Sequence, residues 1–365
     1  MTDERRRFRY FGASTPLTPV AQAIMDENIQ ALEETLGRDW LLNEPFQFSE
    51  RCTGLAIQLA LVERKYRVVD FLLSKRVNLN VAKAPAMVSA VSALDTAIMD
   101  RLIAAGADVR ARNNVGYDAL DQAVAWEAFE LIPYLESKGL SIRGHKGKAL
   151  DSAVFAGNLD FVEYALKKGA DPNQNNSTDQ GGTGGTPLHS AVLRGNFEMV
   201  KLLVRYGANP TRTDVHGQRP YHWAQSDKKK QIAEYLRGIE PKALHDARAK
   251  LSLAKRYGAP ADLIEFMGGS DRRLKASEGR MVVELWPIED LYEFRWMGRR
   301  YLTLSRVVED EFACGEIVWC KKRRAVCVID IEHDELFEMG GWSDFARDPA
   351  AAIARIWNGE LDERN

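Results

Sequence analysis

Apolar residues recur at helical spacing through the first two thirds of the chain, in pairs of short segments separated by turn residues. Seven alanines occupy matching places in this pattern at intervals of 30 to 38 residues: Ala23, Ala60, Ala90, Ala123, Ala153, Ala191 and Ala224. A period of about 33 residues is typical of a solenoid, in which each helix–turn–helix copy buries its apolar face against its neighbours. The pattern therefore predicts a mainly α solenoid of about seven copies.

The clearest copy begins at Thr186 and shows why these residue types recur. Threonine can cap a helix, and Pro187 is tolerated in the first turn, where its missing N–H is not needed. The small Ala191 lets the first helices of neighbouring copies pack closely, and Gly195 ends the first helix. Apolar residues at helical spacing then predict the buried stripe of the second helix: Phe197, Val200 and Leu203.

This copy reads Thr-Pro-Leu-His at residues 186–189 and Gly-Ala-Asn-Pro at residues 207–210, and it resembles the ankyrin repeat. The resemblance covers about residues 15–238. It implies a protein-binding surface made of the hairpin tips and the concave face of the first helices. It also implies that His189 and His222 hydrogen-bond to the local turn and take no part in catalysis.

Other copies depart from this pattern at three informative places. Arg76 stands where a glycine is expected after the second helix. Pro133 lies inside a second helix and predicts that this helix is kinked or shortened. The last copy has Arg-Pro-Tyr-His at residues 219–222, which fits a terminal copy that faces the domain that follows instead of another repeat.

The pattern changes to alternation after about residue 280. Short runs rich in β-branched and aromatic residues predict strands at 281–286, 301–304, 316–319 and 325–329, the last two joined by a basic hairpin turn at 321–324. Helical patterns flank them at 243–257 and 343–357. We therefore expect an N-terminal arm at 1–14, ankyrin repeats at 15–240, and a small α+β domain with an antiparallel sheet at 241–365.

Two segments of this second domain carry a further resemblance. They read Trp-Pro-Ile-Glu-Asp-Leu at 286–291 and Trp-Ser-Asp-Phe-Ala at 342–346, where the last helix is predicted to open. Together with the layout of elements over about residues 243–359, they resemble the SUKH superfamily. Many SUKH proteins are bacterial immunity proteins that neutralise toxins, and ankyrin arrays recur as immunity modules in the same systems. The resemblance therefore implies a toxin as the partner.

Composition narrows the classes of partner. The net charge is −2, so the chain has no general attraction to nucleic acid or to an anionic membrane surface. The first ten residues are polar and basic, and no apolar stretch is long enough to span a membrane. Four cysteines in 365 residues do not make a disulfide framework, which favours a cytoplasmic location. We expect a protein partner, with neither nucleic acid nor membrane involved.

Candidate catalytic chemistry is weak throughout the sequence. The glycine-rich residues 181–185 lack the Lys and Ser/Thr that a phosphate loop needs, so we expect a lengthened loop between two copies. Cys314, Cys320 and Cys327 lack the short paired spacing of zinc ligands and are expected to be structural thiols. With no nucleophile and base in a recognisable arrangement, the prediction is a protein that is not an enzyme and uses no metal or cofactor.

One acidic segment leaves three interpretations open. Asp330, Glu332 and Asp334 alternate with apolar or neutral residues, so a strand here would place all three carboxylates on one face. That face is either solvated, or a metal or acid–base site, or an acidic stripe that meets a basic partner.

Partner-binding positions follow from the ankyrin resemblance. They lie two and three residues after the repeated alanine, or beside the glycine of a finger, as we call the hairpin loop before each first helix. The predicted set is Tyr117, Trp126, Phe155, Leu193, Arg194, His216 and Gln218, with Trp126, Phe155 and Arg194 as neighbouring steps along one groove. The alternative for Trp126 and Phe155 is packing between first helices.

We therefore predict a module that sequesters a protein partner by steric blockade, most plausibly as a bacterial immunity protein. The alternatives are a scaffold or regulatory adaptor with no toxin partner, and an enzyme whose site lies in the second domain.

Overall fold

A computed structural model describes residues 16–36, 43–49, 52–143, 149–175, 184–225, 229–275, 282–309, 315–331 and 333–357. The chain divides into two compact units, residues 1–174 and 175–365, and each is described by itself. The described residues of the first form mainly helix pairs and one hairpin, and those of the second form helix pairs and β-sheets. The predicted boundary between residues 240 and 241 stays a prediction.

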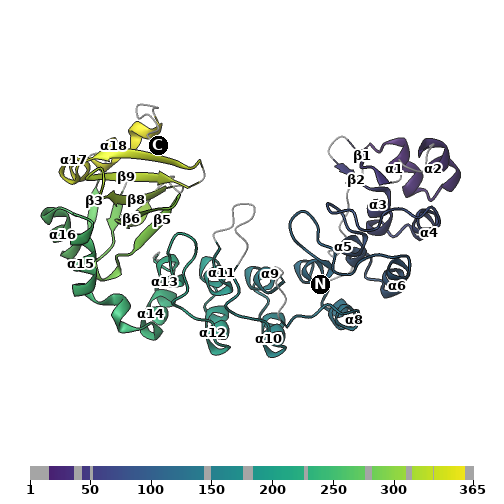
Figure 1. Cartoon of the computed structure of the whole chain (residues 1–365), viewed down its shortest axis with the longest axis horizontal. Helices are drawn as coiled ribbons and strands as arrows, with labels where there is room; N and C mark the ends of the chain where they lie inside the picture. Colours follow the sequence, from purple (N-terminus) through teal and green to yellow (C-terminus); the bar gives the residue numbers. More distant parts are fainter. Residues whose placement is uncertain are drawn as a thin grey trace. The chain divides into compact units, whose positions relative to one another are not determined.

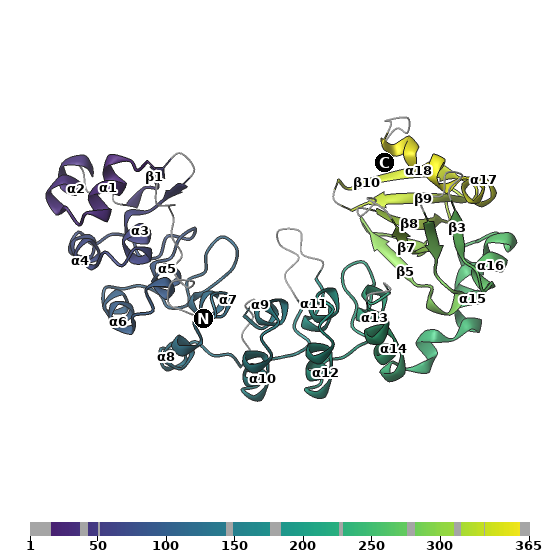
Figure 2. The same cartoon turned by 180° about the vertical axis from the view of Figure 1, so that it is seen from behind.

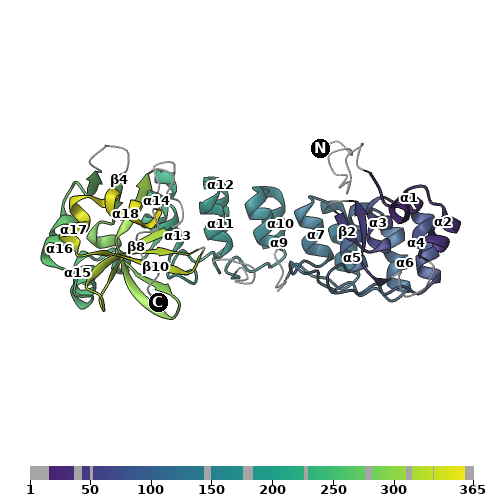
Figure 3. The ribbon, with the colours of Figure 1, turned by 90° about the horizontal axis from the view of Figure 1, so that it is seen from above.

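The first unit is a row of helix pairs (Figure 1). The inner, first helices contact one another in succession, and Figure 3 shows α3, α5 and α7 side by side. The inner helices are α1 (Pro19–Met25), α3 (Ala56–Val62), α5 (Ala86–Ala90), α7 (Ala119–Ala125) and α9 (Ala149–Ala156). The outer helices are α2 (Ile29–Leu36), α4 (Tyr66–Ser74), α6 (Thr96–Ala104), α8 (Ile132–Ser137) and α10 (Leu159–Lys167).

The repeated alanine lies where the inner helices meet. All seven alanines are at most 5% exposed, six of them inside an inner helix and Ala224 as a C-cap. A larger side chain would separate the helices, because protein interiors are close-packed. The predicted role of the alanine is therefore confirmed.

Pro133 shortens its helix as predicted. Helix α8 has 6 residues, whereas α4, α6 and α10 each have 9. Pro133 lies in the first turn of α8, where its missing N–H costs nothing, and the 3₁₀ helix Phe129–Leu131 precedes it.

Ion pairs join the outer helices of the first unit in a ladder. In each pair a carboxylate of one outer helix meets a cation on or just after the next: Glu33 with Lys75, Asp70 with Arg101, Asp100 with Lys138, and Glu136 with Lys168. The hydroxyl of Tyr134 also donates to Asp100, at 2.9 Å. These groups are largely exposed, so each pair contributes little alone.

One element of the first unit was not predicted. Strands β1 (Phe46–Ser49) and β2 (Cys52–Gly54) form an antiparallel hairpin between the first two repeated alanines, near α1 (Figure 2). Thr18 at the start of α1 donates its backbone N–H to Phe48 and its hydroxyl to Gln47, both at the carbonyl oxygen. The hairpin accounts for the long interval between Ala23 and Ala60.

The second unit begins with two helix pairs and ends in a sheet domain. The pairs are α11 (Pro187–Leu193) with α12 (Phe197–Arg205), and α13 (Pro220–Trp223) with α14 (Lys230–Ile239). The 3₁₀ helix η6 (Lys242–His245) then leads to α15 (Ala247–Arg256) and α16 (Ala261–Gly268). The predicted helix at 243–257 is thus observed as η6 followed by α15.

The sheet domain contains two antiparallel sheets. One has the order β3-β4-β7, from β3 (Arg273–Lys275), β4 (Val282–Leu285) and β7 (Ser305–Glu309). The other has the order β10-β9-β8-β6-β5, from β5 (Glu293–Trp296), β6 (Arg299–Thr303), β8 (Gly315–Cys320), β9 (Ala325–Asp330) and β10 (Glu335–Gly340). The four predicted strands and the turn at 321–324 are confirmed, whereas β3, β5, β7 and β10 were missed.

The closing helix is divided. The prediction of one helix at 343–357 is wrong, because α17 (Trp342–Arg347) ends before Asp348 and α18 (Pro349–Trp357) begins at a proline. Pro349 has no N–H to continue the hydrogen bonds of α17. Both helices pack on β10, and Phe345 is fully buried in the core that also contains Phe294 and Leu302.

Candidate protein-binding site

Exposed apolar side chains stand at one equivalent position in two consecutive repeats. Phe155 near the end of α9 and Leu193 at the end of α11 each follow the repeated alanine by two residues. Phe155 is 48% exposed and Leu193 is 51% exposed. Phe155 in the first unit and Leu193 in the second are therefore each a candidate contact for a partner, at a position where the ankyrin resemblance implies one.

Two predicted residues lie three positions after the repeated alanine of their repeats and differ in environment. Trp126, the C-cap of α7, is half-buried, and Arg194, the C-cap of α11, is exposed. The exposure of Phe155 argues against the alternative that it only packs between inner helices. Trp126 and Phe155 belong to the first unit and Leu193 and Arg194 to the second, so the single groove predicted for them stays a prediction.

Tyr117 lies at the base of a finger in the first unit. Its side chain is half-buried, and its hydroxyl is 3.2 Å from the hydroxyl of Ser152 on α9. Val115 at the tip of the same finger is exposed. The finger is thus anchored at Tyr117 and presents Val115 to solvent.

The finger at residues 214–218 contacts the sheet domain of its own unit. The backbone N–H of Arg295 on β5 donates to the carbonyl oxygen of His216 at 2.9 Å, and the His216 ring stacks on Phe294 with centroids 5.1 Å apart. The side-chain amide of Gln218 donates to the hydroxyl of Tyr292 at 2.7 Å and to a carboxylate oxygen of Glu316 at 2.9 Å. The prediction that His216 and Gln218 face an external partner is therefore wrong.

The reason is topological. Strand β5 is an edge of the five-stranded sheet. An edge strand has backbone N–H and C=O groups on its outer side that no neighbouring strand pairs with. The finger satisfies those of Arg295, so this edge is covered within the chain.

Asp330 and Asp334 do not share a strand face. Strand β9 ends at Asp330, Asp334 lies in the following turn with φ of +58°, and Glu332 lies outside the described residues. In this turn the backbone N–H of His333 donates to Asp330 at 3.2 Å. The predicted stripe is wrong because the alternation of residues here continues into a hairpin turn and not along a strand.

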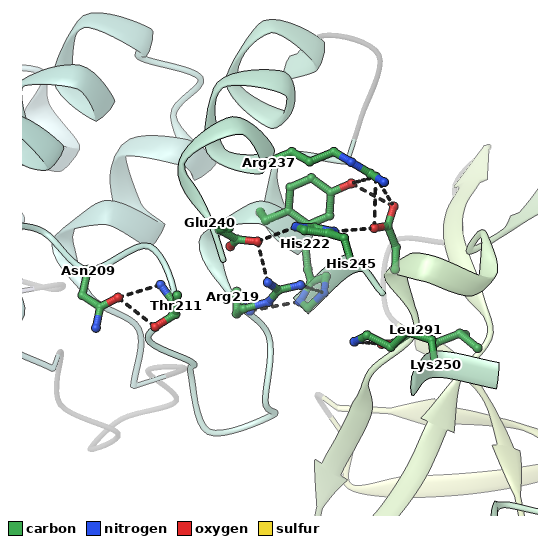
Figure 4. Close-up of polar contacts among 11 residues, drawn as sticks. Asn209, Thr211, Arg219, His222, Arg237, Glu240, His245, Lys250 and Leu291 are labelled. Carbon is green, nitrogen blue, oxygen red and sulfur yellow. Dashed lines mark hydrogen bonds and ion pairs between the residues drawn. The ribbon is translucent and has the colours of Figure 1, made fainter. Parts of the chain in front are cut away.

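A cluster of polar side chains lies between the last repeat and the sheet domain (Figure 4). Arg219 donates to Glu240 at 2.5 Å, and their side chains are 6% and 0% exposed. One ring nitrogen of His245 lies 2.8 Å from the same oxygen of Glu240, and the other lies 3.0 Å from Asp290. His245 therefore connects the two carboxylates, as Figure 4 shows for Glu240.

Asp290 also accepts hydrogen bonds from side chains of α13 and α14. The hydroxyl of Tyr221 donates to Asp290 at 2.8 Å, and Arg237 donates to the Tyr221 hydroxyl at 3.0 Å and to Asp290 at 3.2 Å. Burial, and then the charge of Asp290, raise the pKa of Tyr221 to about 12. This junction confirms the prediction that the divergent Arg-Pro-Tyr-His of the last repeat faces the following domain.

Two further titratable side chains lie at this junction, the buried His222 and the half-buried Lys250. The ring of His222 stacks on Tyr292 with centroids 4.0 Å apart, and burial together with the charge of Arg219 holds its pKa well below 6.5. Lys250 donates to the carbonyl oxygen of Leu291 at 2.5 Å, and burial lowers the pKa of its ammonium group to about 8. These contacts join the last repeat to the sheet domain, which indicates a structural role for the junction.

The two repeat histidines make the local hydrogen bonds that the resemblance implies. The backbone N–H of Thr186 donates to Nδ1 of His189 at 3.0 Å, so Nε2 carries the proton and donates to the carbonyl oxygen of Gln218 at 3.1 Å. Burial lowers the pKa of His189 to about 4. Arg219 donates its N–H to Nδ1 of His222 in the same way.

The remaining sequence candidates are the cysteines and the glycine-rich loop. Cys320 on β8 and Cys327 on β9 are buried thiols, whereas Cys314 and residues 181–183 lie outside the described residues. Within the described ranges, no three His, Cys, Asp or Glu side chains are grouped so as to hold a metal ion. Of the helices that the structure describes, none combines the length and the apolar character needed to cross a bilayer.

Sequence reasoning missed the sheet-domain half of the junction. Nothing in the spacing of Glu240, His245 and Asp290 relates them to Arg219. The divergence of residues 219–222 was the one available signal, because it marks a surface that no further repeat covers.

Comparison with known proteins identifies the repeats. Residues 150–245 match the family described as Ankyrin repeats (3 copies), so the chain contains ankyrin repeats. A segment of 78 residues is 33% identical to the E3 ubiquitin-protein ligase hecd-1 of Caenorhabditis elegans, and it covers 21% of this chain and 3% of that protein.

Two solved structures are also similar. The ankyrin repeat domain of Bcl-3, a unique member of the IkappaB protein family, gives a TM-score of 0.43 at 25% identity and covers 60% of this chain and 98% of its own. The human ASB11 ankyrin repeat domain gives a TM-score of 0.44 at 23% identity, and the match covers 61% of this chain and 99% of that domain.

Proposed function

We propose that this protein is a non-catalytic binding module that holds a protein partner against the ends of its inner helices. One observation carries the proposal: Phe155 and Leu193 are both about half exposed at the same position of consecutive repeats, within the segment that matches ankyrin repeats. Burial of such a side chain by a partner stabilises a complex by about 1.5–3 kcal/mol. Trp126 and Arg194, each three residues after the repeated alanine of its own repeat, are of the types that dominate binding energy at interfaces.

The sheet domain has a supporting role in this proposal. It closes the end of the repeat array through the finger at 214–218 and the buried junction, which a terminal repeat needs in order to cover its apolar face. We further propose the division into repeats at 15–240 and a second domain at 241–365.

A finer proposal concerns the class of partner. We propose a toxin that the chain neutralises by steric blockade, in line with the SUKH resemblance. Support comes from Trp342-Ser343-Asp344-Phe345-Ala346, which opens helix α17 as that resemblance implies. Co-expression with the captured partner tests it: rescue of growth from a partner that is toxic alone supports a toxin, and capture of non-toxic proteins supports a scaffold.

The binding surface itself is tested by paired substitutions. Phe155→Ala with Leu193→Ala should weaken capture of the partner at least about tenfold, while the midpoint of thermal unfolding changes little, because exposed positions contribute little to stability. Leu159→Ala is the matched control, since Leu159 is a partly exposed apolar residue at the start of the outer helix α10. Capture is measured by pull-down and titration. Equal capture by both variants would disprove the proposal.

A further inference from the structure

The finger at residues 214–218 has a defined hydrogen-bonded conformation. One carboxylate oxygen of Asp214 accepts from the backbone N–H groups of His216 and Gln218, at 2.9 and 2.8 Å. The N–H of Asp214 donates to the carbonyl oxygen of Gln218 at 2.9 Å. Gly217 lies at the tip with φ of +86°.

This finger recognises its strand through backbone groups. The N–H of Arg295 donates to the carbonyl oxygen of His216, and Nδ1 of His216 lies 3.0 Å from the carbonyl oxygen of Arg295. The approach is close, because a Cβ atom at Gly217 would lie 2.7 Å from the carbonyl oxygen of Glu293. Such contacts depend on an extended edge strand and little on its sequence.

The finger at residues 113–117 has the same conformation. The side-chain oxygen of Asn113 accepts from the N–H groups of Val115 and Tyr117, at 3.1 and 2.9 Å. The N–H of Asn113 donates to the carbonyl oxygen of Tyr117 at 2.9 Å. Gly116 lies at the tip with φ of +81°. Val115 thus takes the place of His216.

Side-chain hydrogen bonds hold this second finger, and the space beside its tip is open among the described residues. Arg112 donates to the carbonyl oxygen of Gly116 at 2.8 Å and to the buried carboxylate of Asp118 at 2.9 Å. A Cβ atom at Gly116 would meet no atom of the described residues within 4 Å, in the direction where Gly217 meets strand β5. The Val115 side chain is 38% exposed. In the other finger the equivalent residue, His216, stacks on Phe294.

We propose that the finger at 113–117 binds the exposed edge strand of a β-sheet in the partner protein. The carbonyl oxygen of Val115 accepts an N–H of that strand, Gly116 permits the close approach, and the Val115 side chain packs on an apolar residue of the strand. This deepens the proposed function and rests on it. A helix does not fit, because its interior N–H groups already have partners. Strand β5 of a second copy does not fit either, because its own finger covers it.

The probe for the test is a labelled synthetic peptide of residues 290–304, which contains β5 and β6. Its binding to the full chain is measured by fluorescence anisotropy. Gly116→Asn should weaken binding at least about tenfold, because asparagine tolerates positive φ and its Cβ blocks the approach. The matched control is Gly106→Asn, since Gly106 has φ of +95° and equally open space, and it should bind as the native chain does.

A second peptide tests the backbone hydrogen bond directly. Methylation of the amide nitrogen at the position of Arg295 removes the donor and should weaken binding by at least about tenfold. The proposal is overturned if the unmodified peptide does not bind, or if Gly116→Asn or methylation leaves binding unchanged. The Phe155 and Leu193 variants measure the proposed function separately, so their result stands whichever way the peptide behaves.

Discussion

At the scale of single residues, each repeat requires left-handed backbone at two places. The first place lies four residues after the repeated alanine, and the described residues with positive φ there are Glu27, Arg64, Leu94, Glu127, Gly157 and Gly195. The second place follows the outer helix, and the described residues with positive φ there are Arg76, Gly106, Gly139, Gly169 and Gly207. A residue with a Cβ in this conformation costs about 1–2 kcal/mol. The repeat geometry imposes the conformation even where the sequence has no glycine, and Arg76, with φ of +56°, confirms this.

Replacing Arg76 by glycine should therefore stabilise the protein. We expect Arg76→Gly to raise the free energy of unfolding by about 0.5–1 kcal/mol, since relief of strain exceeds the added entropy of the unfolded chain. Urea unfolding followed by circular dichroism measures the change. The reverse substitution at the matched position, Gly106→Ala, should lower stability by about 1 kcal/mol. If Arg76→Gly lowered the free energy of unfolding, the contacts of the arginine side chain would stabilise the protein by more than its left-handed backbone destabilises it.

A second residue-scale effect depends on pH. Burial, together with the charge of Asp214, raises the pKa of Glu316 from 4.5 to about 7, despite the hydrogen bond from Gln218. Because the folded pKa lies above the unfolded one, this group's contribution to stability is fully present below about pH 4.5 and is lost as the pH rises through about 7.

Glu316→Gln should remove this pH dependence. The glutamine oxygen can still accept from Gln218 and does not ionise, so the variant should unfold at a higher temperature than the native chain at pH 8, with the difference shrinking toward pH 5. Calorimetry between pH 5 and pH 8 measures it. Glu265→Gln, on the exposed side of α16, controls for the loss of one negative charge. A difference in unfolding temperature that does not change with pH would contradict the raised pKa of Glu316.

At the scale of elements, the last finger acts as an added partner for an edge strand. Strand β5 has only 4 residues and lies at the end of its sheet, so its pairing with β6 leaves one side to be covered. The sequence shows the finger, and Glu-Phe-Arg-Trp alternates polar and apolar residues as a strand does, but no local pattern shows which strand lies at the edge of the sheet. The contact could therefore not be predicted.

Gly217→Asn should separate the finger from β5. The new Cβ would meet the carbonyl oxygen of Glu293, so the hydrogen bond from Arg295 to His216 should open. We expect faster hydrogen exchange of the Arg295 amide, with exchange inside α12 unchanged. Unchanged exchange at Arg295 would show that the finger adapts to the added atom.

At the scale of the whole molecule, the second unit is built around a buried junction of charges. Arg219, Glu240, His245 and Asp290 come from the last repeat and from the segments that follow it, and they join repeats and sheet domain into one compact unit. Removal of one partner from a buried ion pair leaves the other charge uncompensated, whereas removal of both costs much less.

A double-mutant cycle tests this account. Arg219→Met should lower the free energy of unfolding by about 3–5 kcal/mol, and Arg219→Met with Glu240→Leu should recover a large part of that loss. Urea unfolding followed by tryptophan fluorescence measures both. A double variant as unstable as Arg219→Met alone would contradict this account. It would show that the contacts of His245 and Asp290 depend on the ion pair of Arg219 with Glu240.

Features that depend on local geometry and burial could be predicted from the sequence alone. The buried alanines, the short helix at Pro133, the hairpin at 321–324 and the left-handed turns at glycines such as Gly207 follow from side-chain size, proline chemistry, apolar spacing and the freedom of glycine. Which distant residues meet depends on the tertiary structure. Gln218 binds Glu316 across 98 positions of the chain, and Asp330 and Asp334 flank a turn instead of sharing a strand face. Such contacts depend on the order of strands in a sheet, which no local pattern of residues specifies.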